Sequence, residues 1–214
     1  MDMAPEQILS QEEKDILQEI MNIAFGRASA DLAEVIDIYV ELSVPFVQTI
    51  RAVDLPAYIT AELRNHEMIS VVEQGYLGRF RGMALLVFPA GAGRELFSLL
   101  GDGGDVSSNG LSMAVMEKET LMEVGNILIG ACVGKVAELL DDLVTYSPPR
   151  ITVEEHSGNA VGADLFEQGS MATVMRTVFS FQNRDINGYF FLINSSESFQ
   201  WLKKALYLFL EKYA

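Results

Sequence analysis

The chain carries one pattern of an acid, a glutamate, an asparagine and a glycine twice, with 104 positions between the two asparagines. The two sets are Asp15, Glu19, Asn22 and Gly26, and Glu119, Glu123, Asn126 and Gly130. An asparagine amide can accept one hydrogen bond and donate another, so it can hold a water molecule in line for attack. A neighbouring carboxylate can pair with a lysine on another protein. Because neither group is a nucleophile and neither set can hold a metal unaided, catalysis here requires a substrate that brings its own metal and electrophile.

Both sets lie in sequence that is typical of long helices. The surrounding runs lack proline, and their apolar residues recur at helical spacing. On a helix that turns about 100° per residue, the four members of each set fall within roughly 60° of one another. We call the two sets the first strip and the second strip. Ile16, Ile20 and Ile23 beside the first strip, and Val124 and Ile127 beside the second, are expected to pack into a core.

The asparagine and the glycine of each strip are unfavourable choices inside a helix. A mid-helix glycine costs up to about 1 kcal/mol relative to alanine, and an asparagine amide competes with the backbone for hydrogen bonds. A single strip of this kind would be interpreted as a solvated helix face. Its recurrence favours a function, and the glycines at 26 and 130 indicate that something comes close to the backbone there.

The rest of the sequence predicts two halves with the same order of elements. In the first half we expect a helix from about Gln11 to Ile38, with Ser10 and Glu13 as a capping box, an edge strand over Tyr39–Ile50, a short helical turn within Asp54–Leu63, strands over Met68–Phe80 and Gly82–Phe88, and a helix over Ala90–Leu100. In the second half we expect a helix from Ser112 to about Leu143, a strand over Arg150–Glu155, a turn or helix within Val161–Phe166, a hairpin of Met171–Gln182 and Ile186–Asn194, and a helix over Glu197–Lys212. The glycine-rich stretch 101–110 is the predicted linker.

The similarity of the halves extends to the predicted strands. Met68–Val72 matches Met171–Met175, and Gly82–Val87 matches Gly188–Ile193. The sequence therefore predicts an α+β fold over residues 1–214, a single domain of two halves at about 1–104 and 105–214. We expect a pseudo-twofold axis between the halves, one shared and mostly antiparallel sheet, and both long helices on one face of it.

Composition excludes several classes of function. The net charge of -15 argues against nucleic-acid binding and against docking on an anionic membrane. The single cysteine, Cys132, is expected to be a buried thiol, and the two histidines, His66 and His156, lack a metal-ligand cluster. The apolar runs are too short for a membrane span, and the N-terminus lacks the features of a signal peptide, so a cytoplasmic protein is expected.

The doubled pattern resembles the signature of the CheC/CheX/FliY family of chemotaxis phosphatases. That signature is an Asp or Ser, a Glu four residues later and an Asn three further on, in a long helix. The resemblance covers essentially the whole chain and is strongest to the two-site CheC form. It implies a monomer that removes phosphate from the aspartyl-phosphate of a CheY-like response regulator.

The resemblance also implies roles for individual residues. Glu19 and Glu123 would contact a conserved lysine of the regulator, while Asn22 and Asn126 would position the attacking water. The expected partner-binding residues are Asp15, Gly26, Glu119 and Gly130. Magnesium would be held by the regulator, so this chain is expected to bind no metal or cofactor. Glu119 departs from the signature, which has Ser or Asp at that position.

Two other interpretations stay open at this point. The chain could be a non-catalytic adaptor that binds a response regulator or a CheD-like receptor deamidase. It could also be a structural repeat protein whose strips are only solvated. The first alternative predicts binding without faster phosphate loss, and the second predicts that Glu19 and Asn22 tolerate alanine in every assay of function.

Overall fold

The computed structural model describes residues 9–36, 39–63, 69–100, 112–154, 171–181, 186–195 and 199–213. The helices are α1 (Gln11–Ile36), α2 (Leu55–Glu62), α3 (Ala92–Leu100), α4 (Met113–Leu139) and α5 (Phe199–Tyr213), and a 3-10 turn η2 (Ala52–Asp54) precedes α2. The strands are β1 (Val40–Leu42), β2 (Phe46–Arg51), β3 (Ile69–Leu77), β4 (Gly82–Pro89), β5 (Thr145–Tyr146), β6 (Arg150–Glu154), β7 (Met171–Phe181) and β8 (Asn187–Ser195). The expected order of elements is thus present in the first half and, apart from the stretch 161–166, which lies outside the described residues, in the second half.

The first helix starts where the capping box predicts. The backbone N–H of Ser10 donates to Oε2 of Glu13 at 2.7 Å, and the backbone N–H of Glu13 donates to Oγ of Ser10 at 3.2 Å. These bonds satisfy two donors that the first turn of a helix leaves unpaired. Glu13 is buried, and Lys203 of α5 lies 3.3 Å from its carboxylate, so the same glutamate also joins α5 to α1.

All strands that the structure describes join one sheet through antiparallel pairs. The order is β1-β7-β8-β4-β3-β5, with β2 also paired to β7 and β6 also paired to β3. The short strands that follow each long helix therefore pair with a strand of the other half. The two halves are therefore interlocked through the sheet, and the mostly antiparallel sheet is confirmed.

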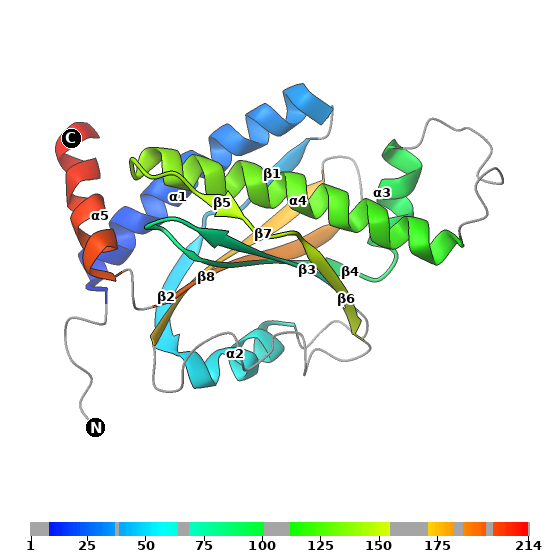
Figure 1. Cartoon of the computed structure of the whole chain (residues 1–214), viewed down its shortest axis with the longest axis horizontal. Helices are drawn as coiled ribbons and strands as arrows, with labels where there is room; N and C mark the ends of the chain where they lie inside the picture. The colour runs from blue at the N-terminus through cyan, green and yellow to red at the C-terminus, as the bar shows by residue number, and fades with distance from the viewer. Residues whose placement is uncertain are drawn as a thin grey trace.

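The sheet separates two apolar cores. Figure 1 shows α1 and α4 crossing on one face of the sheet and α2 on the other. The larger core packs residues of α1 and α4 against the sheet, including Ile20 and Val124, which are at most 1% exposed. The smaller core packs Leu55 and Ile59 of α2 against residues such as Phe191 of β8. The α+β class and the placement of both long helices on one face are confirmed.

A pseudo-twofold axis relates the halves. Gly82 and Gly188 are equivalent in the repeat, and the same offset of 106 positions makes Leu85 of β4 equivalent to Phe191 of β8. Leu85 and Phe191 are direct partners in the sheet, so the axis passes between them. On the helices, Asp31 and Lys135 are equivalent by the offset of the two asparagines, and their side chains meet at 3.0 Å. The axis therefore also passes near this ion pair, between α1 and α4.

Two predicted elements had the wrong bounds, and one strand was not predicted. The stretch 39–50 is not one strand, because β1 and β2 are separated by Ser43, Val44 and the buried Pro45, which has no N–H to donate to a ladder. The second long helix ends at Leu139 rather than near 143, and Asp141 adopts a positive φ of 52° just beyond it. The short strand β5 follows this turn and was not predicted. The histidines and the stretch 161–166 lie outside the described residues.

Helix α4 is more apolar than the sequence analysis assumed. Its 27 residues are long and apolar enough to cross a membrane by length and composition, which corrects the statement that every apolar run is too short. However, 56% of its most apolar window is buried inside the fold. Val124 and Leu128 pack in the helix-side core, while Glu119 and Glu123 are exposed. This pattern is that of a core helix in a globular protein.

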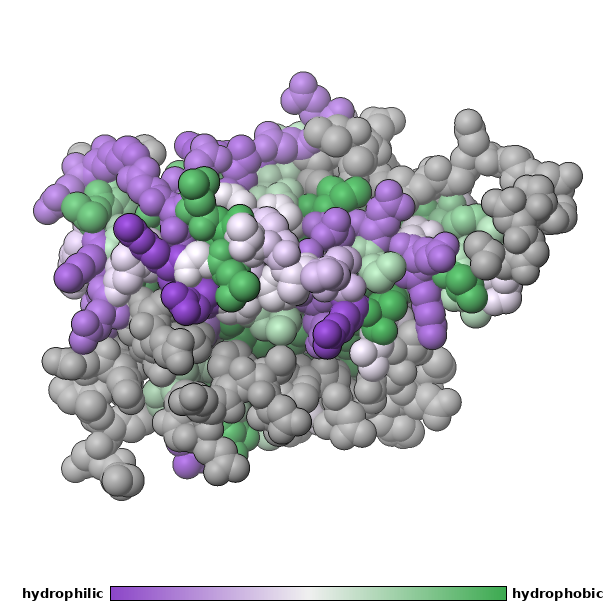
Figure 2. Space-filling view, in the orientation of Figure 1, coloured by the Kyte–Doolittle hydropathy of each residue, from purple (hydrophilic) through white to green (hydrophobic). Residues whose placement is uncertain are grey.

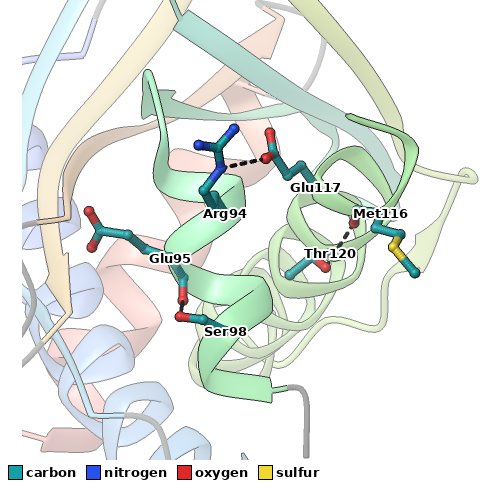
Figure 3. Close-up of polar contacts among 6 residues, drawn as sticks. All are labelled: Arg94, Glu95, Ser98, Met116, Glu117 and Thr120. Atoms are coloured by element: carbon teal, nitrogen blue, oxygen red, sulfur yellow. Dashed lines mark hydrogen bonds and ion pairs between the residues drawn. The ribbon is translucent and has the colours of Figure 1, made fainter. Parts of the chain in front are cut away.

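Helix α3 braces the N-terminal part of α4. Figure 3 shows Arg94 of α3 reaching Glu117 of α4, and Nε of Arg94 lies 3.0 Å from Oε1 of Glu117. Gly93 lets the helices come this close, because a Cβ there would lie 3.0 Å from the carbonyl oxygen of Glu117. Since an exposed ion pair contributes less than about 1 kcal/mol, close packing at Gly93 is the stronger constraint on this end of α4.

Candidate active site

The first strip lies on the face of α1 that points away from the sheet. Asp15, Glu19, Asn22 and Gly26 are all exposed, while Leu17 and Ala24 of the same helix are fully buried. Gln11 donates to Oδ1 of Asp15 at 2.7 Å, one turn earlier on the helix. Within the described part of the chain, Asn22 makes no side-chain hydrogen bond. Its amide is therefore free to turn.

The second strip occupies the equivalent face of α4. Glu119, Glu123 and Asn126 are exposed, and Gly130 is partly exposed. Figure 2 shows pale, weakly polar surface over the middle of this helix, interrupted by purple hydrophilic side chains. The hydroxyl of Tyr146 in β5 donates to the carbonyl oxygen of Gly130 at 3.2 Å, so Tyr146 borders the second strip at its C-terminal end.

The glycines of the strips are not required by packing inside the described structure. A Cβ built on Gly26 or on Gly130 would meet no described atom within 4 Å, and neither residue has a positive φ. By contrast, Gly125 on the core side of α4 is needed, because a Cβ there would lie 2.7 Å from Cγ1 of Val72. The space over Gly26 and Gly130 is open to solvent and to a partner.

One asparagine of the pair is fixed by a residue that the sequence analysis did not select. Nε2 of Gln74 in β3 donates to Oδ1 of Asn126 at 2.8 Å and to the carbonyl oxygen of Ser147 at 3.0 Å. Gln74 is only 3% exposed and lies between Val72 and Tyr76 on the helix-facing side of the sheet. The sequence signal for this residue was a glutamine at a position of the strand where the alternating pattern otherwise places apolar residues.

Each strip carries two carboxylates, those of Asp15 and Glu19 in the first and of Glu119 and Glu123 in the second. Farther along α4, Lys135 pairs with Asp31 at 3.0 Å and with Glu138 at 3.4 Å. The hydrogen bond from Lys135 to Asp31, followed by that to Glu138, raises the pKa of Lys135. Partial burial raises the pKa of Tyr146, so its hydroxyl stays a neutral donor to the backbone of Gly130.

The strips have no internal nucleophile or metal site. Cys132, the single cysteine, is buried on the core side of α4, and burial raises the pKa of its thiol. Among the residues that the structure describes, no three His, Cys, Asp or Glu side chains are grouped so that they could hold a metal ion. The geometry offers carboxylates and amides on two exposed helix faces, which suits recognition of a protein surface.

Comparison with known proteins shows which family the chain resembles. The model of the CheC-like family matches residues 12–48, which include the whole first strip. CheC of Bacillus subtilis (strain 168), described as a CheY-P phosphatase, is 23% identical over 204 residues, covering 92% of this chain and 95% of that protein. The chain is thus similar to a CheC protein along nearly its whole length, and its first long helix matches the CheC-like family model. The resemblance predicted from the doubled pattern is thereby confirmed.

Solved structures of FliY and of a FliM domain share the fold. The crystal structure of Thermotoga maritima FliY matches with a TM-score of 0.67 at 20% identity, over 96% of this chain and 99% of that chain. The FliM middle domain from Vibrio alginolyticus matches with a TM-score of 0.57 at 12% identity, over 88% of this chain and 99% of that chain. The fold of this chain is therefore also found in a FliM domain.

Proposed function

We propose that the protein is a phosphatase that removes phosphate from the aspartyl-phosphate of a CheY-like response regulator. The observation that carries this proposal is the pair of exposed Glu-x-x-Asn strips on α1 and α4 of a chain that resembles the CheC/CheX/FliY family. The relative described as a CheY-P phosphatase aligns along nearly its whole length with this chain. The proposed site of action is the cytoplasm, and the proposed acting species is a monomer.

The proposed mechanism divides the work between the two proteins. Glu19 or Glu123 pairs with a lysine of the regulator and fixes the docked orientation. Asn22 or Asn126 then enters the regulator's active site and holds a water molecule in line with phosphorus. The water oxygen bonds to phosphorus as the bond from phosphorus to the aspartyl oxygen breaks. The products are the aspartate carboxylate and inorganic phosphate, which retains the protons of the water.

The strips explain why the regulator supplies the remaining chemistry in this proposal. Each strip is a helix face rather than a pocket, so the phosphoryl group stays in the regulator, which would also hold the magnesium ion. The chain then contributes only orientation, which is an effective form of catalysis when the reacting atoms are already bound. Asp15 and Glu119, at the start of each strip, are assigned to docking.

The direct test measures the loss of phosphate from a phosphorylated CheY-like regulator in the presence of a small molar amount of this protein. Faster loss, with several regulators turned over per protein, is the expected result. Unchanged decay together with a stable complex would instead support the adaptor. That second candidate is favoured by one observation: the fold is shared with FliM, whose structure in a FliM-SpeE complex from H. pylori matches with a TM-score of 0.58. A CheD-like deamidase is a further partner to test for binding.

Replacing Gly26 by leucine tests whether a partner approaches the first strip. Because a Cβ at Gly26 meets no described atom, leucine is expected to raise the free energy of unfolding by about 0.5–1 kcal/mol through its better helix propensity. If the regulator packs against the backbone there, the same change weakens its binding. Thermal unfolding and titration with the regulator measure the two effects.

Alanine at position 26 is the matched control. It gives a similar gain in stability but adds only one methyl group to the surface, so its effect on binding should be smaller than that of leucine. Equal affinity of the regulator for the glycine, alanine and leucine proteins would contradict close docking at the first strip.

A further inference from the structure

The orientation of the Asn126 amide follows from its surroundings. The carbonyl oxygen of Ser147 can only accept a hydrogen bond, so it must face Nε2 of Gln74 rather than Oε1. The remaining proton of that Nε2 points to Asn126, which must therefore present Oδ1. The backbone of Ser147 thus determines the orientation of both amides. Both Nδ2 protons of Asn126 and one lone pair of Oδ1 remain for a partner.

The first half has the equivalent contacts between a serine and a strand, but it lacks the final contact from the strand to the asparagine of the helix. Ser43 is equivalent to Ser147: its hydroxyl accepts from the backbone N–H of Val178 at 3.0 Å, as that of Ser147 accepts from Gly75 at 2.9 Å. Thr177 is equivalent to Gln74, and its hydroxyl donates to the carbonyl oxygen of Ser43. The threonine side chain is too short to continue to a helix, so the position of Asn22 in α1 has no corresponding support.

Burial makes glutamine a costly choice at position 74. Oε1 of Gln74 is buried and has no hydrogen-bond partner in the described part of the chain. A buried polar atom without a partner destabilises a fold, whereas an apolar side chain of similar size would pack between Val72 and Tyr76 without that penalty. Since Gln74 is too buried to touch a docked protein, its contribution must come through Asn126.

We infer that Gln74 is a positioning residue that holds Asn126 in its working orientation. The second strip is therefore pre-organised. In the first strip, the side chain of Asn22 becomes ordered only when the regulator docks. The inference rests on the proposed function for its catalytic consequence. Immobilising a free polar side chain costs conformational entropy, which lowers the rate of phosphate loss in the docked complex. The usual size of this cost corresponds to a factor of about three to ten in rate. The two strips are therefore unequal in rate for a reason that lies in the sheet below them.

The test uses Gln74→Met in a protein whose first strip is disabled by Asn22→Ala, so that only the second strip acts. Methionine keeps the length and volume of glutamine but cannot donate a hydrogen bond. We expect kcat for regulator dephosphorylation to fall about threefold to tenfold and KM to stay unchanged. The unfolding temperature should stay the same or rise. A merely structural role for Gln74 predicts a lower unfolding temperature and an unchanged kcat, and this pair of results would overturn the inference.

Thr177→Val in a protein with Asn126→Ala is the matched control. It removes the equivalent bond to the equivalent serine carbonyl, on the equivalent strand, but no bond leads from there to Asn22. The rate supported by the first strip is therefore expected to stay unchanged. An equal loss of kcat in the two experiments would show that the rate depends on the bonds to the carbonyl oxygens of Ser43 and Ser147 and not on the contact with Asn126. That result would reject the inference.

A second measurement separates this inference from the proposed function. In ¹H–¹⁵N spectra, the side-chain amide of Asn126 should be ordered, that of Asn22 mobile, and Asn126 should become mobile in Gln74→Met. This readout needs no phosphatase activity. If Asn22→Ala alone fails to speed phosphate loss, the proposed activity of the second strip is wrong, while the spectra still decide whether Gln74 holds Asn126. A mobile Asn126 in the unmodified protein would overturn the positioning role.

Discussion

Replacing both Asn22 and Asn126 by alanine is expected to slow regulator dephosphorylation by about 100-fold to 1000-fold, towards the rate at which the regulator loses phosphate alone. The estimate takes the loss measured when one pre-organised hydrogen-bonding group is removed from other active sites. Both asparagines are exposed, and alanine improves helix propensity at each position. In Asn126→Ala one Nε2 proton of the buried Gln74 also loses its acceptor. The measurement is the rate of phosphate loss at saturating regulator, with circular dichroism to establish that the fold is intact.

The single substitutions, and a control substitution at an asparagine outside the strips, accompany the double variant. Asn22→Ala and Asn126→Ala should each retain the activity of the other strip, with the larger loss for Asn126→Ala if the second strip is pre-organised. Asn187→Ala removes an equally exposed amide at the start of β8 and is expected to leave the rate unchanged. A double variant that still works at the full rate would eliminate the phosphatase proposal, because no other exposed amide recurs at the same position of both long helices.

A large loss of stability is expected from alanine at either of the equivalent glycines 82 and 188. A Cβ on Gly82 would overlap the carbonyl oxygen of Ile193, and a Cβ on Gly188 would overlap the carbonyl oxygen of Val87. Ile193 and Val87 are themselves equivalent, so the repeat imposes one packing requirement twice. Because backbone in the middle of a sheet cannot yield, each substitution is expected to cost about 3 kcal/mol and to lower the unfolding temperature by about 10 °C.

Gly134 of α4 provides the control for these glycines. A Cβ there would lie 3.5 Å from the hydroxyl of Tyr146, which is an ordinary contact. Gly134→Ala is therefore expected to be neutral or to stabilise the protein by up to about 1 kcal/mol. If Gly82→Ala unfolds at the same temperature as Gly134→Ala, the close approach of β4 and β8 at this point is wrong.

The sequence predicted those features that local pattern or recurrence determines. Helical spacing placed Ile20 and Val124 in the core and left both asparagines exposed, and the doubled pattern indicated the pseudo-twofold fold and the resemblance to the CheC/CheX/FliY family. The break between β1 and β2 at Pro45, and β5, were missed because strands of two or three residues are defined by their partners in the other half. Their own composition contains little signal.

The contact of Gln74 with Asn126 could not be predicted from local sequence patterns, because it also depends on residues of the other half. The two residues are 52 positions apart and come from different halves, so their meeting depends on how β3 packs under α4. The repeat could not reveal it either, because the equivalent position carries threonine. Recurrence in a sequence exposes what the halves share, whereas the roles of the individual strips depend on where the halves differ.

The ion pair between Asp31 and Lys135 has a consequence for the history of such a chain. In an assembly of two identical subunits, a side chain on the twofold axis faces its own copy, so a charge there always meets a like charge. Joining the two units in one polypeptide removes that restriction, and each copy can then change alone. Opposite charges can meet at the axis only because the two helices belong to one polypeptide, and the same independence allows the two helices to differ at other equivalent positions.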